Sequence, residues 1–258
     1  MTIIERLQQY KDLQPYKIAL IVDEEQYTYG QLYDAIISME FNNTSRIINL
    51  GQFNDGQKNK VLLIQSLSFV EQLLQWLWGL YKGYIPMVCH NEMDAAYIDE
   101  LARIISVEGV PTSADFGVLT SGTTGRPKPL WRSESSWREF FDIQNNIFYI
   151  NKDTKIFLHG SFSFTGVSNM VVAVLWSGGT VITTSSLRPI RWIQLIDKYH
   201  VDHIYALPTK LRLLVRHCKS KLDSVNYIIG GSQVLDRQLM EQLELICPNM
   251  EFILYYGA

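Results

Sequence analysis

Short apolar segments alternate with longer segments of helical periodicity, and this alternation constrains the fold more than any other feature of the chain. VLLIQ (61–65) is an uninterrupted apolar run of strand length. The segment after it repeats apolar side chains at steps of three and four residues, at Phe69, Leu73, Trp76, Leu77, Leu80 and Tyr81. The first pattern predicts a buried strand and the second a helix with one face on a core. Such strand–helix pairs build a largely parallel sheet covered by helices.

The same alternation continues to the end of the sequence. Strands are predicted at 61–65, 84–89, 116–120, 155–159, 180–184, 203–207, 225–229 and 251–255. Helices are predicted at 68–83, 94–107, 166–176, 188–199, 208–219 and 235–246, and a further one starting at Ser136, where Glu139 would complete a capping box. Because roughly eight strands exceed one small sheet, we expect an α/β fold of two stacked, doubly wound, mostly parallel subdomains. Their boundary is expected near residue 184.

Composition excludes several classes of protein. A net charge of −3 gives no sign of a surface for nucleic acid or anionic membrane. The three cysteines are few, odd in number and far apart, which argues against a disulfide framework and favours a reducing, cytoplasmic location. No apolar run approaches the ~20 residues that a transmembrane helix needs. The sequence leaves the oligomeric state open.

The stretch LTSGTTGRPK (119–128) has the chemistry of an anion-binding loop. Two glycines allow close backbone approach to a ligand, four hydroxyl side chains can donate hydrogen bonds, and Arg126 and Lys128 add positive charge. A Walker A loop needs glycine directly before the lysine, whereas Pro127 stands there. Placed after a strand and before a helix, the stretch suits a polyphosphate. By composition alone, a polar surface turn is an equal alternative.

The order of these residues closely resembles the signature of the adenylate-forming superfamily, which includes acyl-CoA synthetases, luciferases and the adenylation domains of peptide synthetases. Other family segments are matched in the same order by YTYGQLYDAI (27–36), GLYKGYIPMVCH (79–90), HIYALPTKLRLLV (203–215), IIGGSQVLDRQLMEQL (228–243) and YYGA (255–258). The resemblance covers nearly the whole chain, and the glycine loop is its most specific element.

The resemblance implies a two-step reaction with ATP, Mg²⁺ and coenzyme A. A carboxylate attacks the α-phosphate of ATP to give an acyl-adenylate, and a thiol on coenzyme A or a carrier protein then takes the acyl group. Lys128 and Thr124 are the expected catalytic groups. Nucleotide binding is expected at Thr120, Ser121, Gly122, Thr123, Thr124, Gly125, Lys128, Gly230, Gly231, Ser232, Tyr256 and Gly257.

The family's reaction also needs groups that no position here matches. A Thr and a Mg²⁺-binding Glu follow the YGA segment in the family, and a ribose-binding Asp and a small C-terminal domain with a catalytic Lys come later. We therefore expect residues 1–258 to be an incomplete N-terminal adenylation domain, a piece of a longer enzyme rather than a naturally short protein. Alone, it should bind nucleotide weakly and not catalyse adenylation.

SFSFTGVSNM (161–170) resembles the segment that forms one wall of the family's acyl pocket, which places Phe164, Thr165 and Gly166 at the substrate. Amino-acid adenylating members carry Asp where Thr165 stands, and that Asp pairs with the substrate's ammonium group. Because a buried, unpaired ammonium is costly, Thr165 favours a plain fatty or aromatic acid. Thr165 could also simply cap the helix that begins there.

Three functions remain open from the sequence. The first is an acyl-CoA ligase, the second an amino-acid adenylating domain that serves a carrier protein, and the third a non-catalytic nucleotide-binding module. No metal site is predicted, because His200 and His203 lack a further ligand nearby in the sequence. Cys89 falls in a predicted buried strand and is not expected to be a nucleophile.

Overall fold

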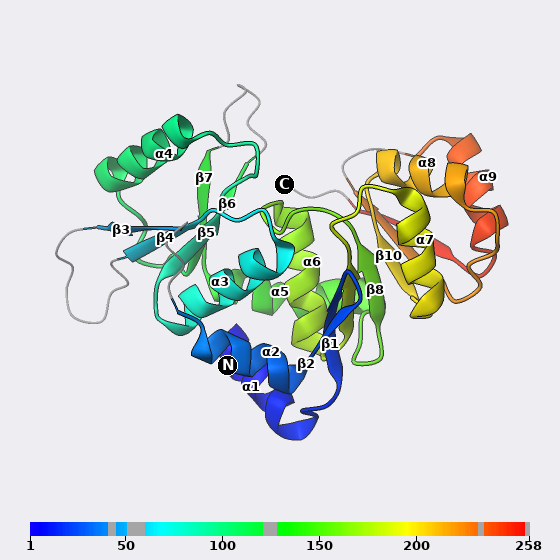
Figure 1. Ribbon diagram of the computed structural model, residues 1–258, viewed down its shortest axis with the longest axis horizontal. Helices are drawn as coiled ribbons and strands as arrows, with labels where there is room; N and C mark the ends of the chain where they lie inside the picture. The colour runs from blue at the N-terminus through cyan, green and yellow to red at the C-terminus, as the bar shows by residue number, and fades with distance from the viewer. Residues whose placement is uncertain (41–44, 51–59, 121–127, 232–234, 256–258) are drawn as a thin grey trace. The chain divides into compact units, whose positions relative to one another are not determined.

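Two separate sheets organise the chain (Figure 1). The computed structural model describes residues 1–40, 45–50, 60–120, 128–231 and 235–255. Within these ranges the chain divides into two units. Unit 1 contains Met1–Tyr16, Tyr29–Phe141 and Gly160–Asn169, and unit 2 contains Lys17–Thr28, Asp142–His159 and the residues from Met170 onward.

The predicted α/β class is confirmed, with two mostly parallel sheets. The division is not one boundary near residue 184, because the chain passes between the units several times. The strands at Ile18–Val22 and Glu25–Thr28 join the second sheet, although they precede every strand of the first sheet in sequence. A boundary inferred from a single point along the chain cannot represent such an interleaved arrangement.

Unit 1 is built on a five-stranded sheet. Its strands, in spatial order, are β3 (Arg46–Asn49), β4 (Lys60–Ile64), β5 (Ile85–Val88), β6 (Phe116–Leu119) and β7 (Pro129–Arg132). The three central strands are parallel and the two edge strands antiparallel to them. The helices assigned to unit 1 are α1 (Ile3–Leu13), α2 (Tyr29–Ser38), α3 (Phe69–Tyr81) and α4 (Ala95–Glu108).

Two helices of unit 1 begin where the sequence predicts. Ser68 caps α3 by accepting the Glu71 N–H, and Asp94 caps α4 by accepting the Tyr97 N–H at 2.7 Å. The apolar face of α4, with Ile98, Leu101 and Ile105, packs on buried side chains of the central strands. Fully burying each such side chain contributes roughly 1.5–3 kcal/mol.

Unit 2 is built on a seven-stranded sheet. Its strands, in spatial order, are β12 (Glu251–Tyr255), β11 (Tyr227–Gly231), β10 (His203–Tyr205), β8 (Lys155–Leu158), β9 (Thr180–Thr183), β1 (Ile18–Val22) and β2 (Glu25–Thr28). All neighbouring pairs are parallel except β1 with β2. Parallel strands end at a common edge, so the carboxyl ends of β8, β10, β11 and β12 lie together.

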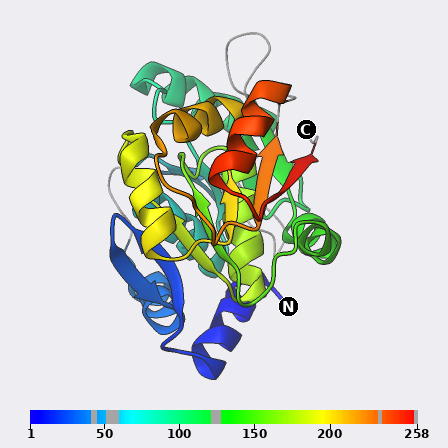
Figure 2. The same cartoon turned by 90° about the vertical axis from the view of Figure 1, so that its right-hand side faces the viewer.

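Three amphipathic helices cover one face of this sheet, as Figure 2 shows for the yellow-to-red part of the chain. They are α7 (Pro189–Lys198), α8 (Pro208–His217) and α9 (Arg237–Ile246). Trp192, Leu211 and Leu239 come from these helices and share one buried cluster with strand residues such as Ile204 and Ile228. Pro at the start of α7 and α8 fixes the backbone where an N–H has no intrahelical partner.

Two further helices cross from unit 1 to unit 2 along the chain: α5 (Glu134–Ile147) and α6 (Thr165–Ser177). The predicted start of α5 at Ser136 is wrong. Ser133 is the capping residue, since its Oγ accepts the Ser136 N–H at 3.2 Å three residues into the helix. The capping box was predicted three residues too late because this segment contains several hydroxyl and acidic side chains, and several of them could act as the cap.

Candidate functional site

The glycine-rich stretch connects β6 to β7 in unit 1. These strands pair antiparallel, with Leu119 opposite Pro129. At the base of the connection, the Thr120 N–H donates to the Lys128 carbonyl at 3.0 Å. The Lys128 N–H donates in turn to Thr120 Oγ1 at 3.1 Å. Two hydrogen bonds therefore hold the two ends of the stretch together, as a ligand-binding loop on a rigid base requires.

The connection is a hairpin between two strands, which corrects the predicted strand–loop–helix arrangement; α5 begins only after β7. Pro129 occupies the first position of β7, an edge strand, where its missing N–H is tolerated. The Lys128 side chain is exposed. Ser121, Gly122, Thr123, Thr124 and Gly125 lie outside the described residues, so their expected role in nucleotide binding stays a prediction.

The glycine pair of the predicted adenine site ends β11 in unit 2. Gly230 lies opposite Leu254 and Gly231 opposite Tyr255 on β12. A Cβ on Gly230 would come within 2.6 Å of Phe252 Cζ, and one on Gly231 within 3.0 Å of Tyr255 Cε1. Both glycines are therefore needed for aromatic packing within the sheet. Ser232, Tyr256 and Gly257, expected to complete this site, lie outside the described residues.

Further polar groups gather at the same carboxyl edge. Tyr205, the last residue of β10, has its hydroxyl 3.1 Å from that of Tyr255 at the end of β12. Burial raises the pKa of Tyr205, so its hydroxyl stays protonated. Ligands of open α/β sheets bind outside the carboxyl ends of the strands, which makes this edge of unit 2 the expected nucleotide side.

His159 and Lys210 form a pair at this edge that the sequence did not single out as functional. His159 directly follows β8, and Lys210 lies in the first turn of α8. The Lys210 ammonium donates a hydrogen bond to the His159 carbonyl, and burial lowers the pKa of Lys210. Burial and the Lys210 charge lower the pKa of His159 to about 4, so the ring is neutral at pH 7. The imidazole ring lies 4.5 Å from the Trp192 ring.

The predicted acyl-pocket wall lies in unit 1 where α6 begins. The Phe164 carbonyl accepts the Ser168 N–H at 3.0 Å, so Phe164 occupies the cap position and Thr165 is the first helical residue. Thr165 therefore does not cap α6, which removes the structural alternative for this residue. Phe164 is 49% exposed and stacks on the ring of His90, with centroids 5.0 Å apart. Thr165 and Gly166 are both half-buried.

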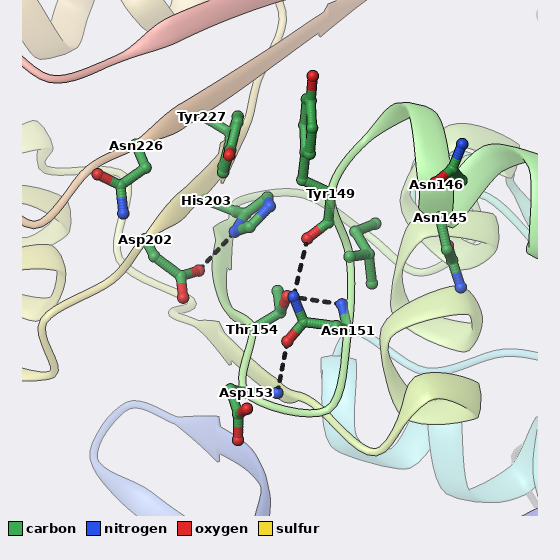
Figure 3. Close-up of a pocket in the computed structure, with 11 residues that line it drawn as sticks. Asn145, Asn146, Tyr149, Asn151, Asp153, Thr154, Asp202, His203, Asn226 and Tyr227 are labelled. Atoms are coloured by element: carbon green, nitrogen blue, oxygen red, sulfur yellow. Dashed lines mark hydrogen bonds and ion pairs between the residues drawn. The ribbon is translucent and has the colours of Figure 1, made fainter.

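A polar pocket of about 510 Å³ opens at the opposite, amino edge of the sheet in unit 2 (Figure 3). His203 lies in its wall with Nδ1 2.5 Å from Asp202 and Nε2 3.0 Å from the Phe148 carbonyl. Both ring nitrogens therefore have protein partners. Within the described ranges, no group of three or more His, Cys, Asp or Glu side chains is placed to hold a metal ion, and the Mg²⁺ that the resemblance implies has no ligand set among them.

None of the helices in the described parts of the chain is both long and apolar enough to span a bilayer. Cys89, Cys218 and Cys247 are free thiols. Burial raises the pKa of Cys89 to about 12, so this thiol is protonated and a poor nucleophile at pH 7.

Solved structures share this fold. VinN in complex with L-aspartate matches the whole chain with a TM-score of 0.78 at 12% identity, over 76% of that chain. The inhibitor-bound N-terminal domain of FACL13 from Mycobacterium tuberculosis matches the whole chain with a TM-score of 0.77 at 16% identity, again over 76% of that chain. At these identities the likeness establishes the fold alone: α/β with two mostly parallel sheets.

Sequence relatives point to the same family. VraA of Staphylococcus epidermidis, whose name is a provisional assignment as a long chain fatty acid-CoA ligase, is 24% identical over 273 residues and covers 99% of this chain. The chain spans only 58% of the length of VraA. YhfT of Bacillus subtilis, an acyl-CoA ligase without characterisation, is 28% identical over 170 residues, covering 66% of this chain and 34% of YhfT. The AMP-binding enzyme family matches residues 111–258, more than half of the sequence, and the chain belongs to that family.

Proposed function

We propose that the protein carrying this chain activates a plain carboxylic acid with ATP, as an acyl-adenylate, and transfers the acyl group to a thiol. Coenzyme A is the proposed acceptor and a fatty or aromatic acid the proposed substrate. Membership of the AMP-binding family supports the use of a nucleotide. The names of VraA and YhfT support the acyl-CoA ligase class.

In this proposal, the β6–β7 connection binds the β- and γ-phosphates. The two hydrogen bonds between Thr120 and Lys128 support this role, because they hold the ends of the connection in place through the backbone of Lys128 and leave its ammonium unused. A nucleotidyl transfer of this kind depends on positioning and charge neutralisation more than on a protein nucleophile. Lys128 and Thr124 would supply charge and a hydroxyl donor there.

The adenine is proposed to lie against Gly230 and Gly231. Gly230 and Gly231 are buried at the carboxyl end of a parallel strand, where ligands of open α/β sheets bind, and neither carries a side chain that would keep a flat ring from the backbone. Ser232, Tyr256 and Gly257 would complete the contact. The Mg²⁺ of the reaction is proposed to bind through sequence not matched in this chain.

The observation that carries the choice of substrate is Thr165 at the first position of α6. Thr165 is half-buried and brings no negative charge, and its neighbour Phe164 is apolar and half-exposed. A substrate ammonium placed here would lose water without gaining an anionic partner. An alkyl or aryl chain would instead cover the Phe164 ring. This favours plain acids over α-amino acids.

A panel of carboxylates tests the proposal in the natural protein that carries this chain. Medium- and long-chain fatty acids, benzoates and α-amino acids are each mixed with ATP, Mg²⁺ and coenzyme A, and thioesters are identified by mass spectrometry. We expect acyl-CoA from a fatty or aromatic acid and none from amino acids. Aminoacyl transfer to a carrier protein would instead establish the amino-acid adenylating alternative, and nucleotide binding without any product the non-catalytic one.

A further inference from the structure

We infer that Gln72 is a positioning residue for the acyl-pocket wall. Its amide holds the segment 161–164 in place and acts on the substrate through Ser161, Ser163, His90 and Phe164 rather than by contact. The inference rests on the proposed function, since it assigns a role within the same site. All of the residues involved belong to unit 1.

Gln72 lies in the first turn of α3 and is 1% exposed. An amide buried this deeply is costly unless its hydrogen bonds are satisfied. Its Nε2 donates to the Ser66 carbonyl at 2.6 Å and to Asn91 Oδ1 at 2.9 Å. Its Oε1 accepts from Ser161 Oγ at 3.0 Å and from the Phe162 N–H at 3.0 Å. The Ser66 carbonyl can only accept, which fixes the orientation of the amide.

From Gln72 the hydrogen bonds continue to the exposed end of the wall. Ser161 Oγ lies 2.8 Å from Ser163 Oγ and accepts the Ser163 N–H at 3.2 Å. Ser163 Oγ lies 2.9 Å from His90 Nδ1, and the His90 ring stacks on Phe164. Burial lowers the pKa of His90, which keeps the ring neutral at pH 7. A continuous set of contacts thus joins the buried amide to the half-exposed Phe164 ring.

The apolar side of the segment is fixed as well. Phe162 is 1% exposed and meets the rings of Trp76 and Phe69 edge-on, with centroids 5.6 and 6.0 Å away. Phe162 and Ser161 are therefore anchored, whereas Phe164 faces outward. A wall held this way is pre-organised for a ligand, since few side chains need to be ordered on binding. Gln72 is the one described residue that hydrogen-bonds to both Ser161 and Phe162.

Gln75 provides a matched control. It lies three residues further along α3, is 2% exposed, and its Oε1 accepts a hydrogen bond from Ser45 Oγ. None of its described hydrogen bonds reaches the segment 161–164. Replacing either glutamine by leucine removes a buried amide from the same helix. Only the Gln72→Leu change removes the link to the wall.

Isothermal titration calorimetry on the 258-residue chain tests the inference with two probes: AMP, and dodecanoyl sulfamoyl adenosine, a non-hydrolysable acyl-adenylate analogue. We expect Gln72→Leu to lower the affinity for the acyl analogue about tenfold or more and the affinity for AMP by less than about twofold. Ser161→Ala should lower the affinity for the acyl analogue about threefold and leave the affinity for AMP unchanged. Gln75→Leu should leave both affinities within about twofold of the parent chain.

Thermal unfolding checks that each variant is folded. If Gln72→Leu does not fold, the result for Ser161→Ala decides whether the inference holds. Equal losses for both probes would show a general structural effect and overturn the inference. Unchanged acyl affinity in both variants would overturn it too, while leaving the proposed function standing. A parent chain that binds AMP but gains nothing from the acyl chain would overturn the inference together with the proposed acyl pocket.

Discussion

At the scale of single residues, Gly230 makes the closest packing demand of the predicted site. Gly230→Ala places a methyl group 2.6 Å from Phe252 Cζ, so the ring must move. We expect a loss of about 1–3 kcal/mol in the free energy of unfolding, measured with urea. Adding Phe252→Leu should restore part of that stability, because the shorter side chain leaves room. Full stability of Gly230→Ala alone would show that the β11–β12 packing is looser than described.

The lowered pKa of His159 leads to a prediction of how the stability of the fold depends on pH. The folded protein lowers the pKa of His159 to about 4 from an ordinary value of 6.5. Between these two values the unfolded chain binds more protons than the folded one, so stability falls as the pH drops through this window. Because the ring is partly exposed, the expected loss is about 1 kcal/mol rather than the full value of the shift. Urea unfolding at pH 7 and pH 5 measures it.

His159→Gln is the control for this prediction, since glutamine does not titrate. The variant should show a smaller difference in stability between pH 7 and pH 5 than the parent chain. Identical differences in the two proteins would mean that other groups cause the pH dependence.

At the scale of elements, the sequence prediction and the structure give different capping residues at the start of α5. Ser133→Ala removes the oxygen that caps the Ser136 N–H and should cost about 1 kcal/mol of stability. Ser136→Ala removes a hydroxyl that donates to the Ser133 carbonyl and should cost less. Urea unfolding of the two variants compares them. A larger loss in Ser136→Ala would support the sequence-based cap position instead.

Most elements with a strong apolar pattern after residue 60 were predicted, whereas the apolar strand β1 and the helices α1 and α2 were not. The predicted α3, α4 and β8–β12 agree with the structure to within a few residues, because buried faces impose a readable pattern. The edge strands β2, β3 and β7 were missed, because most of their side chains are exposed or half-buried and the strands lack a continuous buried apolar run. The hairpin form of the glycine stretch was missed for the same reason, since β7 carries a weak signal.

The residues of the candidate site also differ in whether the sequence alone could indicate them. The roles of Gly230, Thr120 and Lys128 were expected from the resemblance of local segments to a family and stay predictions. His159, Lys210 and Gln72 were not, because their significance comes from burial and from partners that are distant in sequence. Lys210 bonds to a residue 51 positions away, and Gln72 to one 89 positions away. No pattern within one segment contains such information.

At the scale of the whole molecule, the interleaved units bear on what residues 1–258 do by themselves. Both sheets and their cores are formed within the described parts of this chain. We therefore expect the 258-residue chain to fold and to bind AMP weakly in a calorimetric titration. The family's metal-binding Glu and catalytic Lys match no position here, so ATP–pyrophosphate exchange should be absent. Carboxylate-dependent exchange by this chain alone would contradict that prediction.

The central claim is that the protein carrying this chain joins a carboxylate to ATP to form an acyl-adenylate. Carboxylate-dependent exchange of labelled pyrophosphate into ATP, in the natural protein that carries this chain, tests it most directly. We predict exchange with a fatty or aromatic acid, none without a carboxylate, and a rate at least about tenfold lower in Lys128→Ala, because a charge that stabilises the transition state is lost. Exchange that occurs only with α-amino acids would contradict the account. So would a lack of exchange with every carboxylate in the panel.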